Sequence, residues 1–148
     1  MADTVVFSKI LHIRENEKKA AQKVYYQAMD VFEKVASELY ILLKKKEAAE
    51  ETYDQYIQTT TALDRIIDQV NYIQQLNNQI VLVEKNVQKA RADMETKQLK
   101  LTDAHVEVKK FEKIIELRKE TEANEAKQFE KTFMDEISMN QYLSDKNG

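Results

Sequence analysis

The residue types that most often carry metal or phosphate chemistry are scarce in this sequence. It has two histidines, His12 and His105, no cysteine, and one glycine, which is the terminal Gly148. A metal site would need at least one more rigidly placed ligand, so we interpret both histidines as solvated residues on the helix flanks. Phosphate-binding loops need interior glycines that let the backbone approach the ligand closely. We therefore expect no metal site, no cofactor and no nucleotide hydrolysis by this chain alone.

Neighbouring carboxylates are common, as in Glu15 with Glu17 and Glu50 with Glu51. A carboxylate becomes a useful general acid or base when burial in a concave pocket shifts its pKa. The elements that would carry these groups are long charged helices, because the chain has no proline and one third of its residues are charged. We interpret the carboxylates as solvated charges and predict that the protein is not an enzyme.

A heptad stripe predicts how the second half of the chain packs. One set of its positions recurs every seventh residue: Ile73, Ile80, Val87, Met94, Leu101, Val108 and Ile115. The interleaved set is Leu76, Val83, Ala90, Lys97, Ala104 and Phe111. Spacings that alternate between four and three residues put both sets on one narrow face of a helix that needs a partner helix.

The threonines Thr59, Thr60 and Thr61 mark the predicted turn. Three consecutive β-branched hydroxyl residues lower helix propensity, and Thr61 with Asp64 has the form of a capping box. We predict one coiled-coil hairpin over 1–148, with a first helix at about 4–58, a turn at about 59–61 and a second helix at about 62–143. The alternative is an unbroken helix that pairs in parallel with a second chain.

The hairpin can be tested by reflecting the stripe about Thr61, since residues equally far from the turn should face each other. The reflected set is Phe7, Leu11, Arg14, Lys18, Ala21, Tyr25, Ala28, Phe32, Val35, Leu39, Leu42, Lys46, Ala49, Tyr53 and Tyr56. All but Arg14, Lys18 and Lys46 are apolar or aromatic. We therefore predict an all-α fold, an antiparallel two-helix coiled-coil hairpin with a longer, overhanging second helix.

The reflection also leaves two apolar regions without a partner in the hairpin. Beyond about Leu117 the second helix has none, and its end carries Phe129, Phe133, Met134 and Ile137. This cluster is either a partner-binding site or packs on itself.

The second region is an edge of the second helix beside the seam, at spacings of four, three and four: Tyr72, Leu76, Gln79 and Val83. Leu76 faces Lys46, so we expect it to be poorly covered, unless the aliphatic stem of Lys46 lies over it.

Charge and hydropathy argue against nucleic-acid binding and against insertion in a membrane. The formal net charge is −3 with both signs interspersed, which provides no basic field for nucleic acid. No segment reaches the apolar length that spans a bilayer, and the first residues do not resemble a signal peptide. We expect a protein that is neither exported nor inserted in a membrane.

The chain resembles the FliJ family of flagellar export proteins along nearly its whole length. The opening pattern spaces Phe7, Ile10, Leu11, Arg14 and Glu17 in the family's manner, followed by Ala20 and Ala21. The similarity continues in 71–76 (NYIQQL), in 106–113 (VEVKKFEK) and in the ending at 134–136 (MDE).

The resemblance implies a stalk-like, non-enzymatic component of the flagellar protein export apparatus. Family members insert in the ring of the hexameric export ATPase, stimulate it, contact the cytoplasmic part of the membrane export gate, and are described as handling export chaperones. The expected location is cytoplasmic, peripheral to the membrane at the flagellar base. By analogy, the residues expected at the ring end are Phe7, Leu11, Arg14, Phe129 and Phe133.

The family's gate-binding edge falls on Tyr72, Leu76, Gln79 and Val83. Tyr72 and Leu76 match the family pattern in kind, whereas Gln79 and Val83 replace its alanine and histidine. Two other functions stay open: a structural coiled-coil adaptor without an ATPase, and a helix-binding chaperone that uses the C-terminal aromatic cluster.

Overall fold

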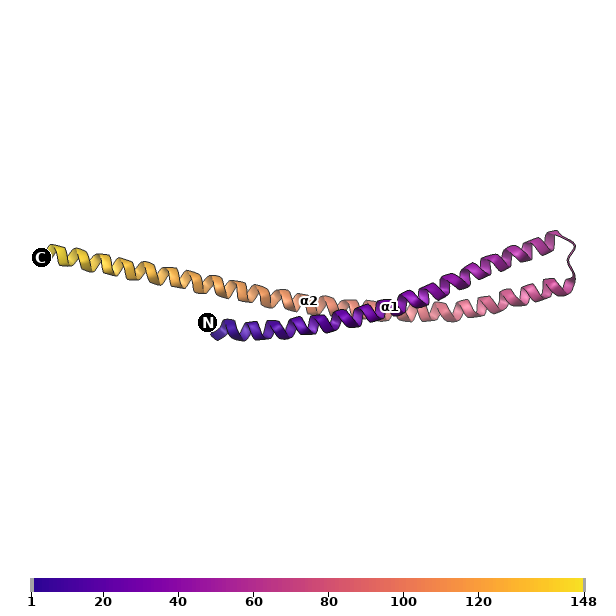
Figure 1. Ribbon diagram of the computed structural model, residues 1–148, viewed down its shortest axis with the longest axis horizontal. Coiled ribbons are helices and arrows are strands. Elements are labelled where there is room, and N and C mark those ends of the chain that lie inside the picture. Colours follow the sequence, from indigo (N-terminus) through magenta and orange to yellow (C-terminus); the bar gives the residue numbers. More distant parts are fainter. Residues whose placement is uncertain (1, 148) are drawn as a thin grey trace. The chain divides into compact units, whose positions relative to one another are not determined.

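Two helices account for nearly all of the chain. The computed structural model describes residues 2–147, in which α1 spans Ala2–Gln58 and α2 spans Leu63–Asn147. They pack against each other as a helical hairpin with the longer helix second (Figure 1), which confirms the predicted fold class. The helices run without interruption because proline is absent and the one glycine is terminal, so neither helix breaker falls inside them.

The connection at 59–62 is held by threonine side chains and the backbone. Thr59 donates from both its N–H and its hydroxyl to the carbonyl of Gln55, at 3.2 Å and 2.9 Å, which closes the end of α1. The carbonyl of Ala62 accepts the first bonds of α2, from the N–H groups of Arg65 and Ile66. Ala62 therefore occupies the N-cap position that the capping-box pattern assigns to Thr61. The Thr61 hydroxyl lies 3.1 Å from that of Thr59 instead.

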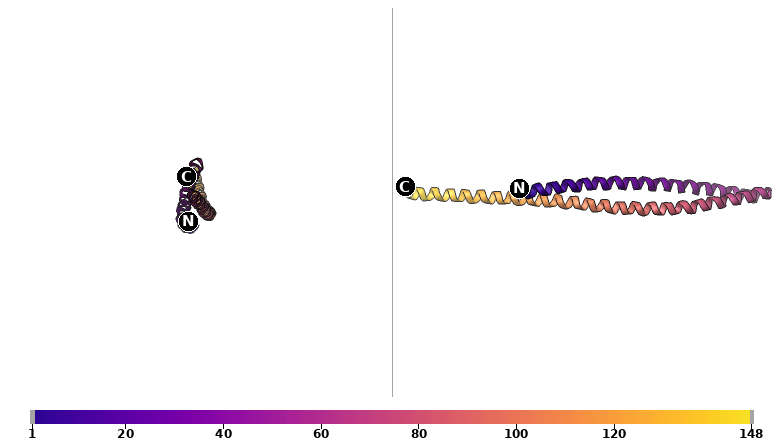
Figure 2. Two further views of the ribbon diagram at one scale, coloured as in Figure 1. Left: turned by 90° about the vertical axis from the view of Figure 1, so that its right-hand side faces the viewer. Right: turned by 90° about the horizontal axis from the view of Figure 1, so that it is seen from below.

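The hairpin divides into two compact units, which we describe separately. The turn unit is Ala20–Thr102, and the open-end unit combines the described residues up to Lys19 with those from Asp103 onward. In the turn unit, α1 and α2 lie side by side and are joined by the connection, as two views show (Figures 1 and 2). Each helix contributes to both units.

A single seam of side chains forms the core of both units. Every position that the heptad stripe and its reflection assign to the seam is buried or half-buried. The most buried are Ala28, Ala49, Leu76, Ile80 and Val87 in the turn unit, and Val108 and Ile115 in the open-end unit. Within the described residues no large side chain is fully buried. The core is therefore one side chain thick, as expected for two helices.

Two lysines at seam positions form ion pairs with carboxylates of their own helix. Lys97 pairs with Asp93 at 3.5 Å, and Lys46 pairs with Glu50 at 3.8 Å. Their aliphatic stems can thus stay at the seam while the ammonium groups reach solvent. A cross-helix bond from the Gln69 amide to the carbonyl of Ala49, at 2.8 Å, closes the turn unit near the connection.

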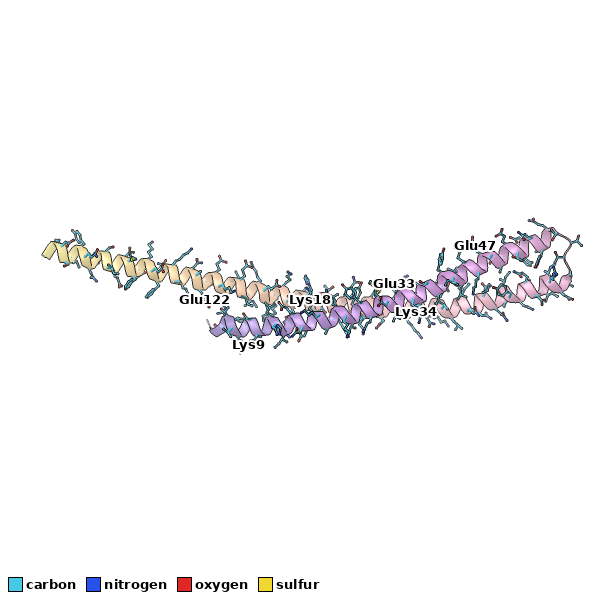
Figure 3. All side chains as sticks on the ribbon, viewed as in Figure 1. Lys9, Lys18, Glu33, Lys34, Glu47 and Glu122 are labelled. Atoms are coloured by element: carbon cyan, nitrogen blue, oxygen red, sulfur yellow. The ribbon has the colours of Figure 1, made fainter. Side chains whose placement is uncertain are left out.

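Pairing in the open-end unit continues one turn further than predicted. Arg118 donates to Asp3 at 3.1 Å, and the Thr4 hydroxyl donates to Glu122, also at 3.1 Å. Figure 3 shows Glu122 on α2 beside the beginning of α1. The prediction that α2 has no partner beyond Leu117 was wrong because it considered apolar positions only, and these contacts are polar. From 123 to 146 every residue is exposed except the half-buried Ile137. We call this segment the overhang.

Candidate partner-binding surfaces

Two arginines and two phenylalanines alternate between the helices in the open-end unit. Phe7 of α1 and Phe111 of α2 have ring centroids 6.4 Å apart. The Arg118 guanidinium carbon lies 5.4 Å from the Phe7 ring centroid, and that of Arg14 lies 5.7 Å from the Phe111 centroid. We call these four residues the arginine–aromatic stack. Each cation–π contact contributes about 0.5–1 kcal/mol at a partly exposed site.

Carboxylates hold both ends of this stack. Arg118 bonds to Asp3, and Arg14 bonds through Nη1 to both carboxylate oxygens of Glu17, at 3.0 Å and 3.1 Å. The Nε atom of Arg14 lies 4.0 Å from Glu107 and is buried without a hydrogen-bond partner in the described structure. Arg14 is therefore held mainly by the contact of its guanidinium with the Phe111 ring and by the bonds from Nη1 to Glu17.

The five residues expected at the ring end separate into two groups. Phe7, Leu11 and Arg14 are half-buried in the seam, so each offers only part of its side chain to a partner. Phe129 and Phe133 are 72% and 53% exposed, with rings 6.4 Å apart and nearly parallel. Helical rise puts Phe129 about 16 Å along α2 beyond Arg118. A partner that touches both groups must therefore follow α2 for about three turns.

The four residues expected at the gate differ sharply in exposure. Tyr72 is 42% exposed and Leu76 is 3% exposed. Gln79 is exposed and Val83 is half-buried. The prediction that Leu76 is poorly covered was therefore wrong. Lys46 stays half-buried at the seam with its ammonium on Glu50, which leaves its stem on the apolar side.

An apolar groove adjoins this edge in the turn unit. It has a volume of about 370 Å³ and is lined by Glu38, Ile41 and Leu42 of α1 and by Gln79, Leu82 and Val83 of α2. Its rims, Ile41 and Leu82, are 53% and 62% exposed. We call it the edge groove. Two of its residues belong to the predicted gate edge.

The contribution of α1 to the edge groove was missed by the sequence reasoning. Ile41 is an apolar residue off the seam, and reflection about Thr61 puts it opposite Val81, one residue from Leu82. That coincidence of two off-seam apolar positions is the signal that could have identified the groove.

Neither of the two histidines belongs to a candidate metal site among the described residues. His12 and His105 are exposed, and the described side chains include no group of three metal-ligating residues. Over its described length, neither helix contains a stretch long and apolar enough to cross a bilayer.

Sequence comparison relates the chain to one family of known proteins. The family model of the flagellar FliJ protein matches residues 4–147. The chain is similar to the flagellar FliJ protein of Bacillus subtilis (strain 168), at 34% identity over 143 residues, which cover 97% of each chain. No solved structure matches the chain. The family match runs through both units, the overhang included. The chain therefore belongs to the flagellar FliJ family, whose members are non-enzymatic components of the flagellar export apparatus.

Proposed function

We propose that this protein is a stalk and adaptor that inserts in the hexameric flagellar export ATPase, stimulates it, and links it to the cytoplasmic part of the export gate. The proposal goes beyond family membership, which establishes only a component of the export apparatus. It gives the protein a cytoplasmic position, peripheral to the membrane at the flagellar base. One observation supports it most: each unit of the hairpin leaves an apolar surface uncovered.

The ring-end surface is in the open-end unit. Phe129 and Phe133 present stacked, exposed rings, which are large apolar anchors of the kind that dominate binding energy at interfaces. Phe7, Leu11 and Arg14 are held in the seam and the arginine–aromatic stack, so they present a fixed surface to the ring. Fixed anchors lose less side-chain entropy on binding.

The gate surface is in the turn unit. Tyr72, Gln79 and Val83 supply its accessible atoms, and the edge groove extends it onto α1. Leu76 supports this surface from below, because its side chain is inside the seam. We assign Leu76 a positioning role rather than direct contact.

The decisive experiment for the proposal measures ATP hydrolysis by the purified export ATPase with and without this protein. We expect stimulation by the native chain. The Phe129→Ala, Phe133→Ala variant should lose at least about 30-fold in apparent affinity, since truncating an aromatic anchor costs about 2 kcal/mol or more. The matched control is Tyr142→Ala, Met139→Ala, which removes two side chains that are each 65% exposed on the same overhang. If the native chain neither raises hydrolysis nor promotes the hexamer, the stalk role is wrong.

A second candidate function is the handling of export chaperones. The observation that favours it is the length of the exposed overhang, which can accept an amphipathic helix along its apolar side. Truncation after Thr121 should then abolish chaperone binding. A truncated chain that still binds the chaperone would exclude the overhang as its site.

A further inference from the structure

A second groove of the turn unit combines an apolar floor with a basic rim. It has a volume of about 620 Å³, and its floor is made by Leu39 of α1 with Val81 and Val87 of α2. Three cations line it, Lys85, Lys89 and Arg91, against one carboxylate, Glu84. We call it the basic groove. Its local charge is opposite in sign to the net charge of the chain, which is −3.

The cations of the basic groove are available to a ligand. Throughout residues 2–147, none of Lys85, Lys89 and Arg91 forms an ion pair. Lys85 and Lys89 are one helical turn apart and exposed, so they form a row on α2. Arg91 is oriented by the Phe32 ring, whose centroid lies 5.6 Å from the guanidinium carbon. Val81, on the floor, is 51% exposed.

The overhang carries an apolar stripe flanked by acidic residues, which complements the apolar floor and basic rim of the basic groove. Phe129, Phe133 and Ile137 recur every fourth residue and form an apolar stripe, and the stacked rings of the two phenylalanines confirm that they share one side. Glu130 and Glu136 each lie three residues from Phe133, one on each flank of the stripe. Neither forms an ion pair in the described part of the chain.

We propose that the overhang of one copy of this chain docks in the basic groove of a second copy. The stripe enters the apolar floor as a helix in a groove, and Glu130 and Glu136 meet the cations on the rim. Lengths agree, because Val81 to Val87 spans about 9 Å and Phe129 to Ile137 about 12 Å at helical rise. Val87 is 6% exposed, so the stripe meets the floor mainly through Val81 and the half-buried Leu39. The docked pair buries Phe129, which at 72% exposure is the most exposed aromatic side chain of the described residues, together with Phe133, and it neutralises charge of both signs.

The contact has two consequences for assembly. Groove and overhang are different surfaces, so each contact uses one groove and one overhang and leaves the second groove and overhang of the pair to bind each other or a third copy. Association in either form rises with the protein concentration. The contact surface is that of one short helix, smaller than a standard interface, so the affinity is in the micromolar range or weaker. The docked overhang also hides Phe129 and Phe133, so the assembled form cannot present them to another partner.

Sedimentation velocity of the full-length chain alone tests the proposal. We expect the weight-average sedimentation coefficient to rise with protein concentration, and the rise to shrink when salt goes from about 0.1 M to about 1 M, where the screening length falls from about 10 Å to about 3 Å. The Lys85→Glu, Lys89→Glu variant should lose at least about tenfold in association constant. The control variant Lys19→Glu, Lys23→Glu changes the net charge equally at two exposed α1 positions and should associate as the native chain does.

Charge exchange between copies gives the sharper test. The Glu130→Lys, Glu136→Lys variant and the Lys85→Glu, Lys89→Glu variant should each be monomeric alone, and their mixture should associate. A native chain that is monomeric at every concentration, or a mixture of the two variants that fails to associate, would overturn the proposal. Because no ATPase is present, this failure would leave the stalk role untouched.

Discussion

Replacing Leu76 with alanine separates a structural role from a binding role at the gate edge. Leu76 is 3% exposed, so the substitution removes three buried carbon atoms, each contributing about 0.8 kcal/mol of transfer free energy, or about 2.4 kcal/mol in all. In a closed core a cavity would add to this loss, up to a total of about 5 kcal/mol. The seam is one side chain thick, and neighbouring side chains and water can fill the gap. We therefore expect destabilisation near the low end, about 2–3 kcal/mol.

Hydrogen exchange of individual amides measures this loss where it occurs, because the two units need not unfold together and a single melting curve would average them. Amides on both sides of Leu76 in α2 should exchange about 30- to 150-fold faster in Leu76→Ala, as 2–3 kcal/mol implies. The control is Leu99→Ala, which removes the same atoms from a side chain that is 67% exposed and should change stability by less than about 0.5 kcal/mol. If Leu76→Ala costs less than about 1 kcal/mol and still impairs export, Leu76 is a contact residue and the reasoning from burial fails.

Two further predictions concern the surfaces. Ile41→Ala with Leu82→Ala should weaken binding of the gate's cytoplasmic part about tenfold in a titration while ATPase stimulation is kept, because both rims of the edge groove are lost. Tyr40→Ala with Leu99→Ala changes two side chains outside the edge groove that are somewhat more exposed, at 62% and 67%, and it should bind normally. Equal affinities for the two variants would refute the groove. Phe111→Leu should raise amide exchange at 4–14 about tenfold, because it removes one ring contact and one cation–π contact. The same change at Phe129, outside the stack, should leave exchange at 4–14 unaltered.

The seam could be predicted from the sequence because it depends on spacing alone. A heptad stripe determines which side of a helix is apolar, and reflection about Thr61 then identifies the facing residues without any knowledge of side-chain conformation. Even Lys46 and Lys97 are half-buried, as their seam positions require.

Other features depend on how individual side chains lie. Leu76 is covered although its predicted neighbour is Lys46, because a lysine stem packs like an apolar side chain when its ammonium has a partner. The arginine–aromatic stack requires particular conformations of Arg14 and Arg118 over rings on the opposite helix. The shape of each groove depends on how far the off-seam side chains of α1 and α2 lie from each other. Spacing identifies candidates such as Ile41, but not the volume between them.

The mirror relation of the seam also limits how the length of the chain can change. Since residues equally far from the connection face each other, an insertion in one helix would shift every pair beyond it unless the other helix gained the same number of residues at the mirrored place. Insertions and deletions in the paired region should therefore occur as matched events, in multiples that restore the heptad. Beyond Glu122, α2 has no such partner among the described residues of α1. Its end is the part of this protein whose length can differ between relatives without any compensating change in α1.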